Sequence, residues 1–323
     1  MGGQYLLRRL IQAFLTIIAI VVLNFFLFRM MPGSPERILL RNPHLTEETV
    51  QAARERWGLD QPVPVQLVKY MVATAQGDLG YSFKYRGQAV AEVIGNRFWP
   101  TIILIGLAEA IAIVAGLALG AYAGWRRGGN VDRIGNGVSL ILYSMPYFVI
   151  GMFMLGIFAT GLGWFPTNGM FELGKQYESI WQQLGDFARH LFLPVMTVAI
   201  GLIGQYSILM RSSVIDTLGE DYVTTARAKG LTDNTVLRDH ALPNALLPAV
   251  TLIAINLGFV IGGAITVEVV FNWPGLGTLT VAAVSARDYP VLQGIFLLLS
   301  ISVVAANLIA DILYGRLDPR VRA

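Results

Sequence analysis

Residues 221–248 read DYVTTARAKGLTDNTVLRDHALPNALLP, a charged segment set between two long runs without charge, residues 191–210 and 241–267. An apolar run of about 20 residues is long enough to cross a bilayer as a helix. A charged segment between two such helices cannot be buried in a core, because its charges would have no partners there. These residues are therefore predicted to lie at a membrane surface, as a candidate docking surface for another protein.

This segment is predicted to form two short helices. Apolar residues recur at three- and four-residue spacing over residues 214–229, which places them on one helical face. Gly230 is expected to end the first helix in a left-handed conformation, and either Thr232 or Asp233 can cap the second. Pro243 has no N–H and disfavours helix at the residue before it. A turn back towards the membrane is therefore expected there.

The composition indicates a polytopic membrane protein. Of the 323 residues, 54% are hydrophobic and 14% are charged, whereas soluble domains carry about 25% charged residues. The chain has no cysteine, which excludes disulfides, thiolate metal sites and cysteine nucleophiles. The formal net charge of +3 is better explained by membrane topology than by nucleic-acid binding, because the cations cluster in short loops.

The uncharged runs predict an all-α polytopic membrane protein with six transmembrane helices. The first is expected within residues 1–31, after a cytoplasmic N-terminus. It is interpreted as a retained span because no small-residue cleavage site follows it. The other five belong to a transmembrane core over residues 98–314. They are predicted at residues 98–125, 134–160, 190–210, 246–270 and 291–314.

The distribution of cations predicts the orientation. Segments predicted to face the cytoplasm hold most of the arginine and lysine, whereas the short outer loops hold only Lys175, Arg189 and Arg287. By the positive-inside rule, both chain ends are expected in the cytoplasm, with residues 315–323 as a tail. Residues 32–97 lack a spanning run and are predicted to form an extracytoplasmic insertion between the first two spans.

Local patterns add three finer predictions. The insertion is expected to be mostly helical. Its helices are predicted at about residues 46–57, 65–76 and 88–97. Glycines recur at every fourth position of the second span, at residues 116, 120 and 124, which allows another helix to approach closely in lipid. The Ser-Met-Pro sequence at 144–146 predicts a kink in the third span.

The charged segment and several further motifs resemble the membrane-spanning permease subunits of ATP-binding-cassette (ABC) importers for di- and oligopeptides and nickel. The cytoplasmic signature of that family is E-A-A, three residues, Gly, nine residues and I-x-L-P. Here its positions hold Thr224-Thr225-Ala226, Gly230 and His240-Ala241-Leu242-Pro243, so the Glu, the first Ala and the Ile are replaced. The other matching motifs are TARAKG at 225–230, MPGSP at 31–35, GDLGYS at 77–82, FNWPGLG at 271–277, RDYP at 287–290 and DPR at 318–320.

The resemblance implies the transmembrane fold of type I ABC importers, in a bacterial or archaeal cytoplasmic membrane. It also implies that residues 214–243 couple the chain to a cytoplasmic ATPase, where the other interpretation is a solvated helix-turn-helix. The implied docking residues are Asp221, Thr224, Thr225, Ala226, Arg227, Lys229, Gly230, Leu242 and Pro243. The implied partners are a second homologous permease subunit, two ATPase subunits or one fused ATPase, and an extracytoplasmic substrate-binding protein.

No catalytic or metal site is predicted in the chain itself. Residues 169–175 read GMFELGK and fit the start of a phosphate-binding loop, but Gln176 replaces the Ser or Thr and no strand precedes it. The three histidines, at 44, 190 and 240, are too dispersed for one metal site. ATP and magnesium are therefore expected on the partner ATPase subunits, with no cofactor in this chain.

Polar residues within or beside the spans are candidates for the transport pathway or the outer gate. Ionisable and polar groups at membrane depth are expected to face protein or a water-filled path. The pathway candidates are Glu109, Gln205, Asn256 and Glu268. The candidates for the outer gate or for contact with the binding protein are Phe271, Trp273, Pro274, Gly275, Arg287 and Asp288. Glu109 can alternatively be a packing residue, and residues 271–277 a turn at the membrane interface. The insertion can likewise be a plain structured loop, or a contact for the binding protein or the second permease.

The function implied by the resemblance is that of a permease subunit forming half of a translocation pathway for peptides. Nickel or its chelates are the other substrate class of the branch. An autonomous secondary transporter or channel would instead show inverted repeats or ion ligands at mid-membrane depth, and neither pattern is evident. A membrane enzyme would need a reactive cluster of side chains, which the sequence lacks.

Overall fold

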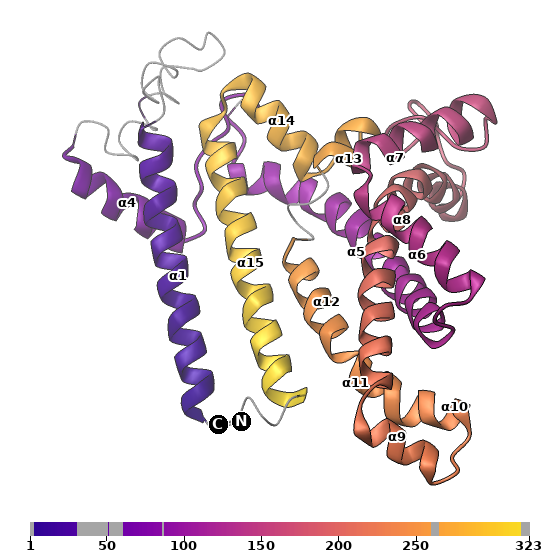
Figure 1. The fold of residues 1–323 in the computed structure, drawn as a ribbon. Helices are drawn as coiled ribbons and strands as arrows, with labels where there is room; N and C mark the ends of the chain where they lie inside the picture. Colours follow the sequence, from indigo (N-terminus) through magenta and orange to yellow (C-terminus); the bar gives the residue numbers. More distant parts are fainter. Residues whose placement is uncertain (1–2, 31–50, 52–60, 86, 260–264, 318–323) are drawn as a thin grey trace. The chain divides into compact units, whose positions relative to one another are not determined.

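The structure, a computed structural model, describes residues 3–30, 51, 61–85, 87–259 and 265–317 (Figure 1). These residues form helices and turns, and their one β-type contact is an isolated bridge between Tyr81 and Ala89. The predicted all-α class is therefore confirmed. The MPGSP motif, the DPR tail and all of the expected helix at 46–57 except residue 51 lie outside the described residues. The described residues fall into two compact units.

The first unit is built on two long helices, α1 (Gly3–Met30) and α15 (Tyr289–Leu317), which pack against each other. It also contains α4 (Val63–Ala75), the start of α5 (Val90–Trp125) and α14 (Leu276–Ala286). An apolar core joins α1, α5, α14 and α15. Its buried members include Phe28, Val90, Ile94, Leu279 and Ile295. The predicted insertion helix at 65–76 matches α4. The one at 88–97 is the first part of α5, so it runs without a break into the second predicted span.

A buried carboxylate fixes one end of this unit. Asp288 is 0% exposed. It accepts hydrogen bonds from the Ser82 hydroxyl at 2.5 Å, the Phe83 N–H at 3.1 Å and the Lys84 N–H at 3.0 Å. The segment before α5 is thereby tied to the junction of α14 and α15. The side chain predicted as an outer contact is thus fully used inside the protein.

The second unit is organised around α8 (Ile180–Leu218), a helix of 39 residues. Ser179 caps its start by accepting a hydrogen bond from the Gln182 N–H. α6 (Asn130–Ser144), α7 (Tyr147–Met154), α11 (Leu242–Ala245) and α12 (Leu247–Phe259) pack against it. The π-helix η1 (Leu155–Gly161) continues from α7, and α13 (Ile265–Val270) lies mostly in this unit. The fourth predicted span, residues 190–210, therefore extends by helix at both ends.

The predicted close approach at the glycines of α5 is confirmed, and the neighbouring helix is α8. A Cβ atom on Gly116 would lie 2.6 Å from Tyr206 Cβ, and one on Gly120 would lie 2.8 Å from Met210 Cβ. Atoms that are not bonded do not approach so closely, so these positions accept only glycine without rearrangement. The two helices are in backbone contact over about three turns.

The third predicted span, residues 134–160, is divided at the place where its kink was predicted. The chain does break at the predicted Ser-Met-Pro sequence, but α6 meets the helix Tyr147–Gly161 at a bend of 103°. Met145 adopts an extended conformation with φ −79° and ψ 130°. A residue before proline disfavours the helical region, and Pro146 has no N–H to continue the ladder. The two helices therefore meet at a sharp corner, and not as one helix with a small kink.

The expected number of six spans is only partly recovered. Among the described residues, four helices are long and apolar enough to cross a membrane: Leu7–Arg29, Val90–Trp125, Ile180–Leu218 and Tyr289–Ile309. The bent pair of α6 with Tyr147–Gly161 makes up to a fifth. The predicted span at 246–270 falls on α12 and α13, which are separated by residues that the structure does not describe. α14 is a helix that the sequence analysis did not expect.

Candidate functional site

The predicted docking segment forms a compact helical hairpin after the end of α8. α9 (Asp221–Ala228) begins after a short break at Gly219-Glu220, so the single helix expected over 214–229 is divided in two. The shared apolar face is nevertheless present. Val223, Ala226 and Val236 form a small buried cluster at the centre of the hairpin. This cluster lets a polar segment keep a defined shape outside the main core.

The turn between the two halves has the predicted chemistry. Gly230 has φ +79°, the left-handed conformation that glycine adopts without strain. The Thr232 hydroxyl then caps α10 (Asp233–Thr235) by accepting from the Thr235 N–H at 3.4 Å. Of the two capping residues left open by the sequence, Thr232 is therefore the one used.

The turn expected at Pro243 is wrong. The chain stays helical from α10 through the π-helix η2 (Val236–Ala241) into α11, and Leu242 has helical angles of −58° and −43°. Pro243 lies in the first turn of α11, where the missing N–H needs no helical partner. The side-chain amide of Asn244 also donates to the Tyr222 hydroxyl at 2.9 Å, which ties α11 to α9.

Most of the predicted docking side chains face outwards from this hairpin. Asp221, Thr224, Thr225, Arg227, Lys229 and Pro243 are exposed. Two members differ, because Ala226 is buried in the hairpin cluster and Leu242 packs beside Met210, Val214 and Ala245. Among the described residues, neither Arg227 nor Lys229 has an acidic partner within ion-pair distance. The exposed cations are thus available to an acidic partner surface.

Three of the four pathway candidates meet in one buried polar chain in the second unit. The Tyr206 hydroxyl donates to Glu109 Oε1, and the Asn256 amide donates to the Tyr206 oxygen at 3.0 Å. The same Asn256 nitrogen donates to Gln205 Oε1 at 3.4 Å. Glu109 is 3% exposed and Tyr206 is 0% exposed. The chain of contacts links α5, α8 and α12.

The sequence analysis missed Tyr206, the residue that joins the others. A tyrosine in an apolar helix is usually a packing residue, and its partners lie 97 and 50 positions away. The available signal was its place beside Gln205, as the single tyrosine in the uncharged run 191–210.

A groove of about 490 Å³ opens beside the polar chain of Glu109, Tyr206, Asn256 and Gln205, between α6, α8 and α12. Its lining residues are Tyr143, Gln205, Ile208, Leu209, Ser212, Pro248, Thr251, Leu252 and Ile255. No lining residue carries a charge, and four of them offer an amide or a hydroxyl group. Gln205 is the residue that belongs both to the groove and to the polar chain.

The remaining candidates lie elsewhere. Glu268, on α13, is 0% exposed and does not line the groove. Phe271 and Trp273, candidates for the outer gate or for a turn at the membrane interface, are both buried in protein. The Trp273 ring lies 5.9 Å from that of Phe187, and the Phe271 carbonyl accepts from the Gly169 N–H at 3.0 Å. Pro274 is half-buried, Gly275 is buried and Arg287 is exposed.

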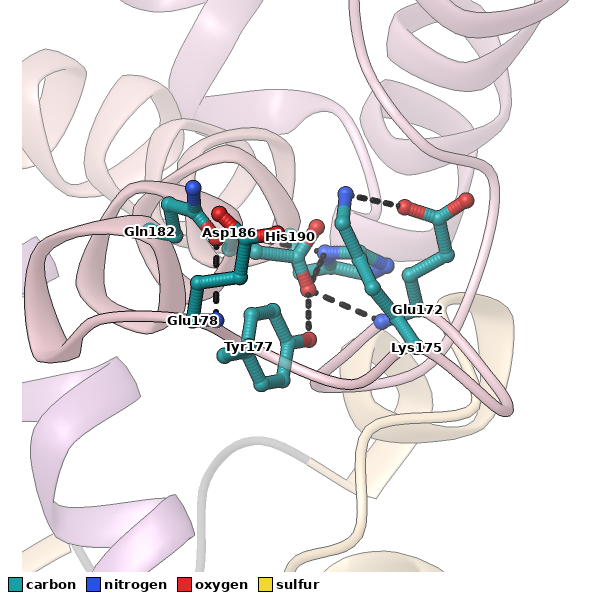
Figure 2. A network of polar contacts seen from close by, with 7 residues as sticks. All are labelled: Glu172, Lys175, Tyr177, Glu178, Gln182, Asp186 and His190. Atoms are coloured by element: carbon teal, nitrogen blue, oxygen red, sulfur yellow. Dashed lines mark hydrogen bonds and ion pairs between the residues drawn. The ribbon is translucent and has the colours of Figure 1, made fainter.

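A second polar network orders the loop before α8 (Figure 2). The Asp186 carboxylate accepts from the Glu172 N–H at 2.8 Å and from the Tyr177 hydroxyl at 2.7 Å, and the His190 ring lies 3.6 Å away. Lys175, the lysine of the apparent phosphate-loop match, pairs with Glu172 at 2.5 Å. That neighbouring carboxylate raises the pKa of Lys175. Among the described residues, no cluster of three His, Asp or Glu side chains could hold a metal ion.

Comparison with known families gives matches along most of the chain. A family model described as "Binding-protein-dependent transport system inner membrane component" matches residues 116–323. The model for the N-terminal part of such membrane components matches residues 3–105. Together they include the docking segment and three residues of the polar chain, Gln205, Tyr206 and Asn256, whereas Glu109 lies between the two matched ranges.

Three curated relatives cover 99% of this chain and are themselves covered to 99%. A putative peptide permease protein of Brucella suis biovar 1 is 37% identical over 320 residues. The glutathione transport system permease protein GsiC of Salmonella paratyphi A is 38% identical over 319 residues. The probable peptide ABC transporter permease protein y4tP of Sinorhizobium fredii is 38% identical over 320 residues.

The fold also resembles a solved structure, titled as inward-facing conformations of the MetNI methionine ABC transporter. The TM-score is 0.56 with 17% sequence identity. The match covers 70% of this chain and 96% of that one. At this identity the likeness concerns the fold alone.

Proposed function

The chain belongs to the family of binding-protein-dependent transport system inner membrane components, and we propose that it is a permease subunit of an ABC importer that takes up peptides. The observation that carries the proposal is the hairpin of α9 to α11, whose exposed Arg227 and Lys229 have no acidic partner among the described residues. The hairpin is polar, in a protein whose long helices are apolar enough to span a membrane. The docking surface would bind a cytoplasmic ATPase, whose closure on ATP would displace the hairpin and the end of α8.

The proposed complex contains this chain, a second homologous permease subunit, two ATPase subunits or one fused ATPase, and an extracytoplasmic binding protein. ATP and magnesium would bind the ATPase subunits, and this chain would contribute no catalytic residue. Peptide substrates are supported by the names of the relatives in Brucella and Sinorhizobium. They are also supported by the groove, whose lining offers no imidazole, thiolate or carboxylate ligand for nickel.

We propose six spans in a bacterial or archaeal cytoplasmic membrane, with both chain ends and residues 214–243 in the cytoplasm. The fifth span would combine α12 and α13 across the residues between them. Residues 32–97 would form the extracytoplasmic insertion, near which the binding protein would dock. The excess of cations in the short segments assigned to the inside supports this orientation.

The docking surface is tested by reversing one of its exposed charges. Arg227→Glu is expected to abolish co-purification of the ATPase and ATP-dependent peptide uptake, because an acidic partner surface would then be repelled. Gly230→Pro should have the same effect, because proline cannot adopt the left-handed angle of that turn. Both variants should still reach the membrane in normal amounts.

Arg133→Glu is the matched control, since Arg133 is exposed and lies in another segment assigned to the cytoplasm. It should leave ATPase binding unchanged. Normal ATPase co-purification with both Arg227→Glu and Gly230→Pro would exclude docking at the hairpin. Solute movement driven by an ion gradient without any ATPase would instead favour an autonomous secondary transporter or channel.

A further inference from the structure

We propose that Glu109, Tyr206 and Asn256 orient the Gln205 side chain so that its amide N–H groups face the groove and bind carbonyl oxygens of the solute. This inference rests on the proposed function, because it takes the groove as part of the transport pathway. It assigns Gln205 as a residue that contacts the solute, and the other three as positioning residues that act through it.

The direction of each hydrogen bond follows from the donors available. The Tyr206 hydroxyl has one hydrogen, and it donates this hydrogen to Glu109. Its oxygen can then only accept, and it accepts from the Asn256 amide at 3.0 Å. The buried carboxylate therefore determines which face of the Asn256 amide turns towards Tyr206.

The orientation of the Gln205 amide follows from the same argument. The Asn256 nitrogen carries two hydrogens, and its second contact is with Gln205 Oε1 at 3.4 Å. Because the oxygen of Gln205 already accepts a hydrogen bond, its Nε2 is the last group in this series of hydrogen-bonded side chains. Within the part of the chain that the structure describes, Nε2 has no hydrogen-bond acceptor. The amide nitrogen is thus left with two N–H donors beside the groove that Gln205 lines.

Helix geometry separates the two roles. Gln205 and Tyr206 are consecutive on α8, so their side chains point about 100° apart around its axis. Tyr206 is fully buried against α5, whereas Gln205 is half-buried and reaches the groove. Tyr206 makes the hydrogen bonds in the interior, and Gln205 places the oriented amide beside the groove.

The rest of the groove makes this donor distinctive. The Thr251 hydroxyl donates to the Leu247 carbonyl at 3.3 Å, so its hydrogen is directed to its own helix. Most other lining groups are aliphatic, and none is charged. Among the described lining groups, the Gln205 amide is the donor whose orientation is fixed by a buried network. A fixed N–H donor binds carbonyl or carboxylate oxygen and cannot ligate a metal cation.

The solute class that fits is therefore one rich in carbonyl oxygens, such as the peptide backbone, whatever its side chains. A bare divalent cation does not fit, since it would meet N–H groups instead of oxygen ligands. Gln205→Glu tests the proposal with a side chain of almost the same shape. It keeps an oxygen for Asn256 and replaces the two donors with a second acceptor.

The experiment uses the complete importer reconstituted in proteoliposomes with its binding protein. The probes are a mixture of tripeptides and pentapeptides and, separately, Ni²⁺. Gln205→Glu is expected to lower ATP-dependent peptide uptake about tenfold, as loss of one hydrogen bond to the solute implies. ATPase activity stimulated by the binding protein should persist. Gln182→Glu is the matched control, because this exposed residue of α8 uses its oxygen to accept from the Glu178 N–H.

Positioning is tested by a double-mutant cycle. Asn256→Ala should reduce uptake, and combining it with Gln205→Ala should reduce uptake no further than Gln205→Ala alone. A purely structural role of Asn256 predicts additive losses. Additive losses would therefore overturn the assignment of Asn256 as a positioning residue.

Three results would overturn the proposal: unchanged peptide uptake in Gln205→Glu, loss of complex assembly together with uptake, and Ni²⁺ uptake that Gln205→Glu increases. Failure of the proposed function looks different. In that case the unmodified complex itself takes up neither probe in the presence of ATP, or binds no ATPase at all.

Discussion

At the scale of single residues, buried polar side chains hold segments of this protein together. Asp288 is the clearest example in the first unit. Its carboxylate accepts from three donors of the segment 82–84, and its loss would deprive the buried Ser82 hydroxyl and the Phe83 N–H of this acceptor. The Lys84 N–H also lies 3.2 Å from Ser82 Oγ, a second acceptor. An unsatisfied buried polar group destabilises a protein by about 1–3 kcal/mol.

Asp288→Asn is therefore expected to lower the thermal unfolding midpoint of the purified protein by several degrees. The amide keeps one acceptor oxygen but turns two hydrogens towards groups that are themselves donors. Ser82→Ala should have a smaller effect, because the Phe83 and Lys84 N–H groups keep Asp288 as their acceptor and only the half-buried Tyr85 loses one, the Ser82 oxygen that lies 2.9 Å from its N–H nitrogen. The measurement is thermal unfolding in detergent, and equal midpoints for Asp288→Asn and the unmodified protein would contradict the assignment.

The sequence predicted some of these residues and not others, for physical reasons. Gln205, Asn256 and Glu109 were found because a polar group at membrane depth needs a partner. Tyr206 and the role of Asp288 were missed because their partners are distant in sequence and meet only after the helices pack. The burial of Phe271 and Trp273 was not predicted, because an amphipathic aromatic residue suits both a membrane interface and a protein core.

At the scale of helices, α5 and α8 are joined by backbone contact at glycine. Gly120→Ala would place a Cβ atom against the Ser207 carbonyl and 2.8 Å from Met210 Cβ, so the two helices would have to separate. Overpacking of this kind destabilises a protein by about 1–3 kcal/mol. A lower thermal midpoint and weaker association with the partner subunits are expected.

Gly106→Ala is the matched control on the same helix. A Cβ atom at Gly106 meets nothing within 4 Å, and alanine has the higher helix propensity. This variant should be as stable as the unmodified protein or slightly more stable. Equal thermal midpoints for Gly106→Ala and Gly120→Ala would show that the α5–α8 contact does not limit stability.

Helix ends were predicted well where the residue at the end determines them. They were predicted poorly where they depend on the position of a proline relative to the next helix. Gly230 and Thr232 act through their own backbone and side chain, so their positions were predictable. Pro146 and Pro243 have the same chemistry but different outcomes, a corner of 103° and a continued helix. The difference lies in whether the proline falls in the first turn of the following helix, which its immediate sequence does not determine.

At the scale of the whole molecule, the absence of cysteine makes the proposed orientation directly measurable. Leu173→Cys places a thiol in the loop before α8, at a position that is 96% exposed, and Lys229→Cys places one in the hairpin. A membrane-impermeant maleimide should label the first variant in intact cells. It should label the second only after the membrane is opened.

The unmodified chain is the control and must stay unlabelled, since it has no thiol. Labelling of Lys229→Cys in intact cells would reverse the orientation and remove the hairpin from the side where ATP is available. The sequence predicted this orientation from charge alone. It did not predict which helices pack together, because packing depends on side chains that meet across long stretches of chain.

The length of α8 has a mechanical consequence. Its closest contacts with α5 extend from Ile203 to Val214, so the free part leading to the hairpin is about 6 Å long and the part reaching back to Ile180 is about 35 Å long. Such a rod is a lever with unequal arms. If a partner moved the hairpin, as the proposed function requires, α8 would tilt about this contact region, and its far end, where the Asp186 network holds the loop, would move most. Pro194 lies in the long arm and breaks its hydrogen-bond ladder, so part of that stroke is absorbed as bending.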